Sequence, residues 1–177
     1  LFCGRYRLTL DRPLIMGVVN VTPDSFSDGG RYATTDAAIR QARALRAEGA
    51  DILDIGGEST RPGAAPVALA EERGRILPVL EAIAAEMPVS IDTRKPALMR
   101  EAVAAGAAMI NDISALEAPG AVDAVASSDA AVCLMHKQGE PQTMQAEPRY
   151  DDVVREVADY LAARVRIAET AGIPRNR

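Results

Sequence analysis

Short apolar runs alternate with longer amphipathic stretches along the chain. Five runs are rich in Val, Ile and Leu and hold few polar residues, at 14–19, 52–55, 89–91, 109–110 and 131–135. A strand buried on both faces of a parallel sheet has this composition, whereas a strand with one wet face alternates apolar and polar residues. The runs therefore predict five buried parallel strands. Residues 8–10 are candidates for a further short strand ahead of them.

Five amphipathic stretches predict helices, at 36–48, 69–85, 96–105, 119–126 and 151–171. Thr35 suits the N-cap of the first helix and Gly49 suits its end. Pro96 and Pro119 occupy positions where a first helical turn tolerates proline. A strand followed by a helix, five times over, predicts one α/β domain with right-handed crossovers and a parallel sheet. This pattern alone leaves open a doubly wound sheet and a (βα)8 barrel.

The two ends of the sequence bear on domain organisation. The chain starts at Leu1 rather than at methionine, and its last helical stretch ends at Gly172 with Pro174 just beyond. Glycine followed by proline is a helix stop that commonly leads into another element. A length of 177 residues suits one domain. We therefore expect residues 1–177 to form a single domain that is incomplete at its C-terminus.

Polar residues gather directly after the predicted strands, at Asn20, 57–61, Asp92, Asn111, Asp112 and His136. The carboxyl ends of parallel strands meet at one edge of the sheet, and in α/β folds that edge holds the active site. For any one of these residues, capping of a loop is the simpler interpretation. Because all five strands show the same pattern, we expect a polar site at this edge.

Composition excludes several partners. The chain is 48% hydrophobic and 25% charged, the balance of a globular protein, and its net charge of −5 repels phosphate backbones, so we expect no nucleic acid partner. No apolar run reaches the roughly 20 residues of a membrane span, and no signal peptide is visible. We expect no membrane partner and a cytoplasmic location. Cys3 and Cys133 lack a CxxC partner, and Cys133 is expected to be buried in its apolar run.

Six motifs carry a resemblance to a known family. They are NVTPDSFSDGG at 20–30, GGESTRPG at 56–63, DTRKP at 92–96, IND at 110–112, CLMHKQG at 133–139 and YDDV at 150–153. In order and spacing they resemble the signatures of dihydropteroate synthases, from about Leu14 to the end. The family fold is a (βα)8 TIM barrel. The resemblance therefore implies a pterin-binding barrel domain, of which this chain supplies about the first five βα units.

The resemblance also implies a transferase reaction in folate biosynthesis. The family displaces pyrophosphate from 6-hydroxymethyl-7,8-dihydropterin pyrophosphate with the amine of p-aminobenzoate, giving 7,8-dihydropteroate. Mg²⁺ is the implied cofactor, the partners are these two small molecules, and a homodimer is the expected assembly. The electron-rich pterin stabilises a cation at the reacting methylene, so no side chain needs to act as a nucleophile. No Ser-His-Asp or Cys-His pairing stands out in the sequence.

Site residues carried over from the resemblance fall into two groups. Asn20 matches the family asparagine near magnesium and pyrophosphate, and an amide oxygen suits a hard metal ion. Asp92 matches the aspartate that holds the pterin ring, where a carboxylate accepts two donors. Asn111 matches the asparagine that reads the pterin edge. Met135 is expected to line the pterin site, although a strand methionine also suits an ordinary core.

The remaining candidates lie in the two long loops. Thr60 and Arg61 match a family loop and offer a hydroxyl and a forked cation for catalysis and substrate binding. Phe26 and Pro62 are the candidate apolar walls for the p-aminobenzoate ring. Arg94 departs from the family pattern, because many members carry a small residue there. Further family site elements (an aspartate, a lysine, an arginine and a histidine) would follow Arg177.

Two other functions remain open at this point. A related pterin-binding barrel that carries a methyl group from a reduced folate to a cobalamin protein would share the aspartate and asparagine positions, but it would lack NVTPDSFSDGG and GESTRPG. A catalytically inactive barrel fragment that serves only in assembly would fit an incomplete domain. The sequence that follows Arg177 separates these readings, because a DPGFGFGK-like stretch is typical of the synthase.

Overall fold

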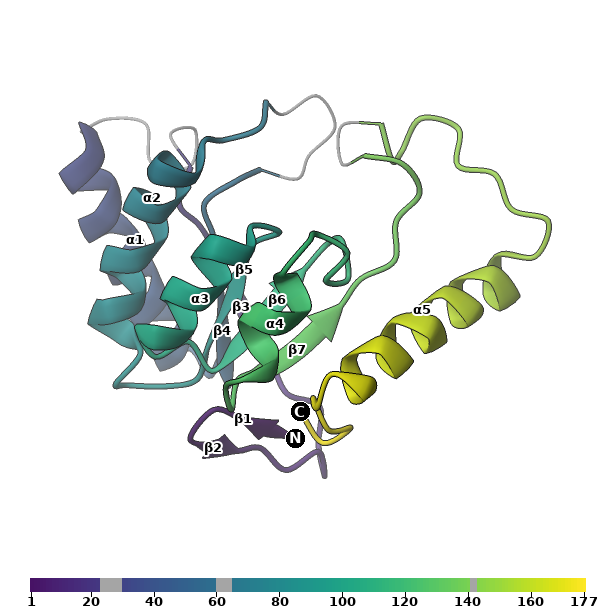
Figure 1. Cartoon of the computed structure of the whole chain (residues 1–177). Helices are drawn as coiled ribbons and strands as arrows, with labels where there is room; N and C mark the ends of the chain where they lie inside the picture. Colours follow the sequence, from purple (N-terminus) through teal and green to yellow (C-terminus); the bar gives the residue numbers. More distant parts are fainter. Residues whose placement is uncertain (23–29, 60–64, 141–142) are drawn as a thin grey trace.

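A five-stranded parallel sheet forms the centre of the computed structural model (Figure 1). The structure describes residues 1–22, 30–59, 65–140 and 143–177, with only the backbone at 30–33. The strands are β3 (Met16–Asn20), β4 (Ile52–Gly56), β5 (Val89–Asp92), β6 (Met109–Asp112) and β7 (Ala131–Leu134). Their order in the sheet is the order in the sequence. A doubly wound sheet would reverse direction at a switch point, so the fold is that of a partial (βα)8 barrel.

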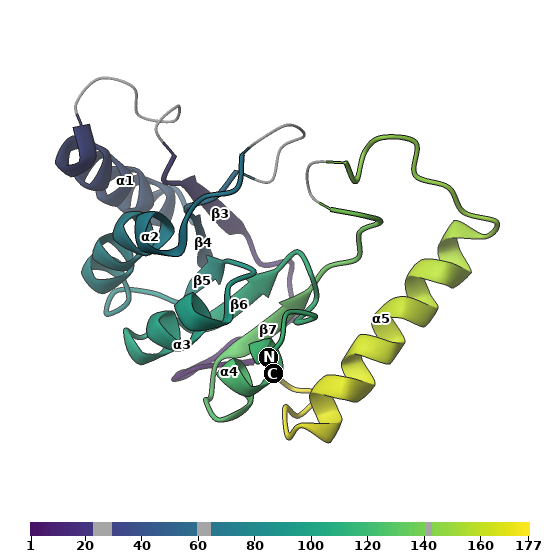
Figure 2. The ribbon, with the colours of Figure 1, turned by 45° about the horizontal axis from the view of Figure 1, so that its top comes forward.

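Helices pack on the outer face of this sheet, except that the last of them lies beyond its β7 edge (Figure 2). They are α1 (Gly30–Ala47), α2 (Leu69–Ile83), α3 (Pro96–Ala104), α4 (Ala121–Ala126) and α5 (Val153–Thr170). The main core packs every second strand residue, such as Leu53, Ile55 and Ile91, against Ile76 and Leu80 of α2. Side chains of a strand alternate between its two faces, so the intervening residues point to the inner side of the barrel.

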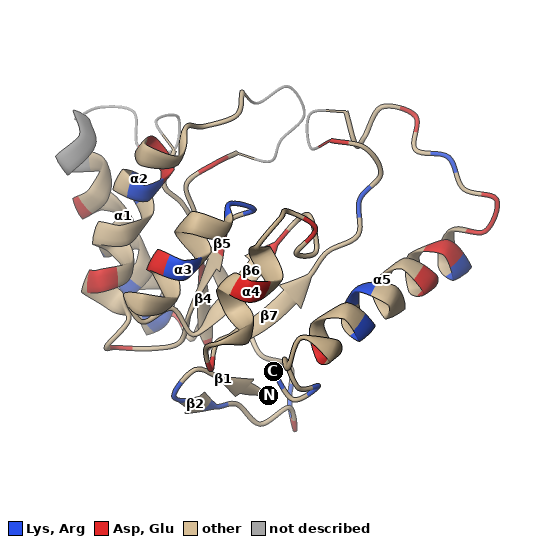
Figure 3. Ribbon diagram, in the orientation of Figure 1, with Lys and Arg blue, Asp and Glu red and all other residues tan. Residues whose placement is uncertain are grey.

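Helix α5 differs from the other long helices in its burial. Ala168 is its one buried residue, while Val154 is 77% exposed. Acidic and basic segments alternate along it (Figure 3). Among the described residues, none of the helices is both long and apolar enough to cross a membrane.

The amino ends of the strands are closed by a hairpin. Strands β1 (Phe2–Cys3) and β2 (Tyr6–Arg7) pair antiparallel around Gly4, whose φ of +56° suits glycine. Cys3 is fully buried against Ala108 and Ala131. The two chain ends meet at this hairpin, where the Phe2 amide donates to the Asn176 carbonyl at 2.7 Å (Figure 1). The described parts of the loops after the strands lie at the opposite end of the sheet (Figure 1).

Several boundaries differ from the sequence prediction. Helix α1 begins at Gly30, so Thr35 lies inside it and is not its N-cap. A helix that is already nucleated extends through Ala and Thr at small cost, which explains the longer helix. Helix α4 begins at Ala121 after Gly120 rather than in the turn of Pro119. The extra strand lies at β1 and β2, not at 8–10.

Other sequence predictions are confirmed. Pro96 lies in the first turn of α3. Gly49 and Gly172 follow the ends of α1 and α5 with φ of +106° and +94°.

Cys133 is a further correction, because it is exposed rather than buried. It occupies an inward-facing position of β7, where the sheet carries polar residues and not the helix-covered core.

Candidate active site

The inner face of the sheet carries a row of polar residues at the carboxyl ends of the strands. Asn20 pairs in register with Gly56, Gly56 with Asp92, Asp92 with Asn111, and Asn111 with Cys133. Residues at equal register on adjacent parallel strands lie side by side and face the same way. The structure thus brings together three residues that the sequence placed at one edge, Asn20, Asp92 and Asn111.

Gly56 leaves space between two of these side chains. A Cβ atom at this position would lie 3.6 Å from Asp92 Oδ2 and 3.7 Å from Asn20 Oδ1. A carboxylate oxygen and an amide oxygen therefore approach the same point from the two neighbouring strands. Two oxygens around an open space of this kind suit a ligand donor or a hard cation.

Asp92 lies in a field of negative charge. Burial, followed by the charges of Asp54, Glu72, Asp112 and Glu58, raises its pKa to about 7. Each of these effects disfavours the ionised carboxylate, and a ligand that donates hydrogen bonds would favour it. Asp92 therefore gains most from a ligand edge that carries N–H donors.

Asp54 is a site residue that the sequence analysis missed. It is 6% exposed, its Oδ2 accepts a hydrogen bond from Asn111 Nδ2 at 3.2 Å, and its Oδ1 has no partner within the described part of the chain. The signal in the sequence was a charged residue in the middle of the apolar run ILDI. Its position two residues before Gly56 points it to the inner face.

Ionic contacts hold the stem of the loop after β4. Lys95 contacts both Glu58 and Glu72, and Arg94 Nε lies 3.1 Å from Glu58 Oε1. The Val67 amide donates to Glu58 Oε2 at 3.1 Å, so Glu58 joins the two ends of its own loop. Burial raises the pKa of Glu58, but Lys95, the Val67 amide and Arg94 together hold it below its usual range.

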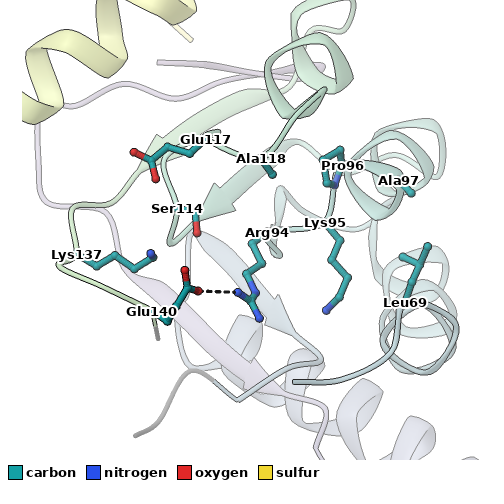
Figure 4. A pocket seen from close by; sticks show the side chains of 10 residues that line it. All are labelled: Leu69, Arg94, Lys95, Pro96, Ala97, Ser114, Glu117, Ala118, Lys137 and Glu140. Carbon is teal, nitrogen blue, oxygen red and sulfur yellow. Dashed lines mark hydrogen bonds and ion pairs between the residues drawn. The ribbon is translucent and has the colours of Figure 1, made fainter. Parts of the chain in front are cut away.

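A cavity of about 540 Å³ opens between the loops that follow β5, β6 and β7 (Figure 4). Arg94 and Glu140 face each other across it, with 3.5 Å between Arg94 Nη1 and Glu140 Oε2. Lys137 also lines it and donates to the Gly139 carbonyl at 2.7 Å. Arg94, which departs from the family pattern, therefore links the loop after β4 to the loop after β7.

Other predicted residues take different places. Met135 is 41% exposed and lies just beyond β7, two residues after Cys133 and so on the same side. Thr60, Arg61, Pro62 and Phe26 lie outside the described residues.

Asp112 and His136 do not join the inner row. The Asp112 carboxylate accepts from the backbone amides of Ser114 and Leu116 at 2.8 Å each, so it orients the loop after β6. The His136 ring packs edge-on against Tyr160, with 5.0 Å between the ring centroids. Both side chains therefore serve the packing of loops beside the site.

The oxygen donors of the row match the needs of a metal ion only in part. Within the ranges that the structure describes, no group of three or more His, Cys, Asp and Glu side chains is placed to hold one. Mg²⁺ often binds through one or two protein oxygens and completes its shell with water and substrate phosphates. Asn20 Oδ1, beside the open space at Gly56, fits that limited role.

The fold, with its polar row at the carboxyl ends of parallel strands, is of the kind found in (βα)8 barrel enzymes, whose ligand sites lie at that edge. Residues 16–177 match the family described as pterin binding enzyme, and the chain belongs to this family.

Its relatives within the family include dihydropteroate synthases. The dihydropteroate synthase of Escherichia coli K12 is 49% identical over 179 residues, which cover 100% of this chain and 64% of that protein. The chain therefore spans less than two thirds of that relative's length.

Solved structures of dihydropteroate synthases are similar as well. The Burkholderia cenocepacia enzyme, complexed with 7,8-dihydropteroate, has 52% identity and a TM-score of 0.88, over 100% of this chain and 60% of that chain. The Xanthomonas albilineans enzyme with 4-aminobenzoic acid has 56% identity and a TM-score of 0.88, over 96% of this chain and 61% of that chain.

Proposed function

We propose that the protein acts as a dihydropteroate synthase, condensing 6-hydroxymethyl-7,8-dihydropterin pyrophosphate with p-aminobenzoate. The observation that carries the proposal is the row Asn20, Asp92 and Asn111, in a chain about half identical to dihydropteroate synthases. Structures of such relatives with 7,8-dihydropteroate and with 4-aminobenzoic acid support the two substrate classes. Because the chain spans 64% of its E. coli relative, residues from outside it are proposed to complete the site.

The pterin is proposed to lie on the inner face with its guanidine-like edge toward Asp92. The ionised carboxylate accepts two N–H donors from that edge. Asn111 accepts or donates one further hydrogen bond from the next strand. Met135 offers apolar contact from the end of β7. The neighbouring carboxylates disfavour the ionised form of Asp92 in the absence of a ligand. Hydrogen bonds donated by the pterin would offset part of this repulsion.

The leaving pyrophosphate is proposed to lie at Asn20. Its Oδ1 would hold Mg²⁺, which supplies positive charge for the departing phosphate oxygens when bound. Thr60 and Arg61 are the proposed donors from the loop whose stem Glu58 closes. Phe26 and Pro62 are proposed to wall the p-aminobenzoate ring. The carbon–oxygen bond to pyrophosphate breaks, the amine nitrogen bonds to the methylene carbon, and the amine proton leaves to solvent.

The test is pyrophosphate release from the pterin pyrophosphate, with and without p-aminobenzoate. The 177-residue chain and the full product of its gene are assayed side by side with Mg²⁺. Release that depends on p-aminobenzoate in the gene product supports the synthase. A folded gene product that releases none contradicts it and favours methyl transfer from a reduced folate or a role in assembly alone. Sedimentation of the same sample tests the proposed homodimer.

A further inference from the structure

One hydrogen bond on the inner face spans three strands. Asp54 pairs in register with Ser90, and Asn111 pairs with Asp92. The 3.2 Å bond from Asn111 Nδ2 to Asp54 Oδ2 therefore crosses β5 between Ser90 and Asp92. Ser90 is fully buried, and its Oγ has no partner among the described residues. A small side chain at Ser90 leaves room for this crossing.

The chemistry of the pair decides how the Asn111 amide is turned. An ionised carboxylate only accepts hydrogen bonds, so Asp54 requires the NH₂ end of the amide. The reversed amide would place two oxygens at that distance. Asn111 therefore keeps Oδ1 and one N–H for other partners, in a fixed arrangement.

Stability does not explain a carboxylate at Asp54. A buried ionised group destabilises the fold unless its oxygens are well paired. Asp54 is 6% exposed, and of its two oxygens only Oδ2 has a partner in the part of the chain that is described. The charge of Asp54 also raises the pKa of Asp92, which belongs to the row of polar residues on the inner face. A role in ligand binding therefore explains a carboxylate at Asp54 better than a contribution to stability does.

We propose that Asp54 is a positioning residue that fixes the amide orientation of Asn111, so that the site presents one defined pattern of donor and acceptor to the pterin edge. This inference rests on the proposed function and deepens it. Asp54 acts through Asn111, which pairs in register with Asp92 on the neighbouring strand. Without Asp54, the amide takes both orientations, and only one of them matches the ligand.

The experiment is a double-mutant cycle on the full gene product. Isothermal titration calorimetry measures binding of 6-hydroxymethyl-7,8-dihydropterin pyrophosphate with Mg²⁺. The variants are Asp54→Asn, Asn111→Ala and the pair. Asp54→Asn keeps the size of the side chain and still hydrogen-bonds Asn111, but it accepts either amide orientation. We expect it to weaken binding about tenfold in the parent, the size of one misdirected hydrogen bond, and to cause no further weakening in the Asn111→Ala background.

Two controls separate the alternatives. Asp123→Asn on α4 removes one exposed carboxylate away from the row and is expected to bind like the parent. A loss of affinity from Asp54→Asn that persists in full without Asn111 overturns the proposal, because Asp54 would then act independently of the Asn111 amide. Parent-like binding by Asp54→Asn also overturns it. A parent protein that binds no pterin removes the proposed function itself, and this inference with it.

Discussion

The protonation state of Asp92 determines which hydrogen bonds the inner face offers to a ligand. Its pKa of about 7 means that both forms are populated near neutral pH. The ionised form accepts two hydrogen bonds, whereas the protonated form offers one donor in place of an acceptor. A pterin edge with two N–H donors therefore selects the ionised form.

We expect affinity for 6-hydroxymethyl-7,8-dihydropterin to rise with pH up to about 7 and then to level off. Below the pKa, each pH unit lowers the ionised fraction about tenfold, and the affinity follows. Calorimetry between about pH 5 and pH 9 measures this, and the ligand without phosphates avoids their titration. Asp92→Asn should weaken binding and abolish the pH dependence, while Asp123→Asn keeps it. A flat profile for the parent protein contradicts the prediction.

Gly56 and Gly57 make a matched pair of substitutions. A Cβ at Gly57 would lie 3.0 Å from Ile76 Cγ1, whereas a Cβ at Gly56 would make ordinary contacts of 3.6 Å or more. We expect Gly57→Ala to lower the free energy of unfolding by about 1–3 kcal/mol through overpacking. Gly56→Ala should keep stability and reduce synthase activity, because the methyl group fills the space beside Asn20 and Asp92. Thermal melts and the pyrophosphate assay check both, and the opposite ranking of the two melts refutes the prediction.

Much of the site was predictable at the residue scale, because Asn20 and Asp92 each end a strand and Asn111 lies one residue before the end of its strand. Asp54 was not, because its contact with Asn111 depends on the register of three strands. The spacing of residues along the sequence does not reveal how neighbouring strands are aligned. The Asp112 carboxylate, by contrast, serves its own loop through the bonds that it accepts from the Ser114 and Leu116 amides.

At the scale of elements, the apolar runs predicted every strand of the main sheet, because buried parallel strands are apolar throughout. The periodicity did not choose between a barrel and a doubly wound sheet, since both repeat β-α units. Strand order decides this, and it emerges only when the strands pair. Helix starts failed where the local cap at Thr35 competed with extension of α1.

The ionic contacts of Lys95 join α2, α3 and the loop after β4. Glu72 is 1% exposed, and in the described structure its carboxylate is paired with Lys95. We expect Lys95→Met to lower the free energy of unfolding by about 3 kcal/mol, because it leaves a buried charge unpaired. Synthase activity should fall as well, because Glu58 loses its ion pair with Lys95, which helps to fix the two ends of the loop after β4.

Denaturant unfolding measures the Lys95→Met effect. Arg155→Met is the matched control, because its pair with Asp159 is exposed on both sides and contributes little. Equal stability of the two variants contradicts the prediction. Lys95→Met/Glu72→Gln should recover part of the loss, because it removes the unpaired buried charge.

At the scale of the molecule, the inner face and the ends of the sheet expose apolar side chains. Ile15 is 60% exposed, Val18 52% and Met135 41%. Apolar side chains that lie on an uncovered face of a sheet commonly mark a contact with another surface.

We expect the 177-residue chain to bind an apolar fluorescent dye more strongly than the full product of its gene. The reason is that residues outside 1–177 would cover this face in a protein of the relatives' length. Fluorescence titration at equal concentration measures the difference. Val18→Thr should reduce the signal of the 177-residue chain, and Val79→Thr, which changes the helix-covered core, serves as the destabilised comparison. Equal dye binding by the two proteins speaks against an uncovered face.

The meeting of the two chain ends makes this part of the barrel close to a ring in its connectivity. The Phe2 amide bonds the Asn176 carbonyl, and the Val132 amide bonds the Arg177 carbonyl at 2.9 Å. These two bonds tie the N-terminal hairpin and β7 to the segment that follows α5. Residues that are far apart in the sequence therefore close the amino end of the sheet together.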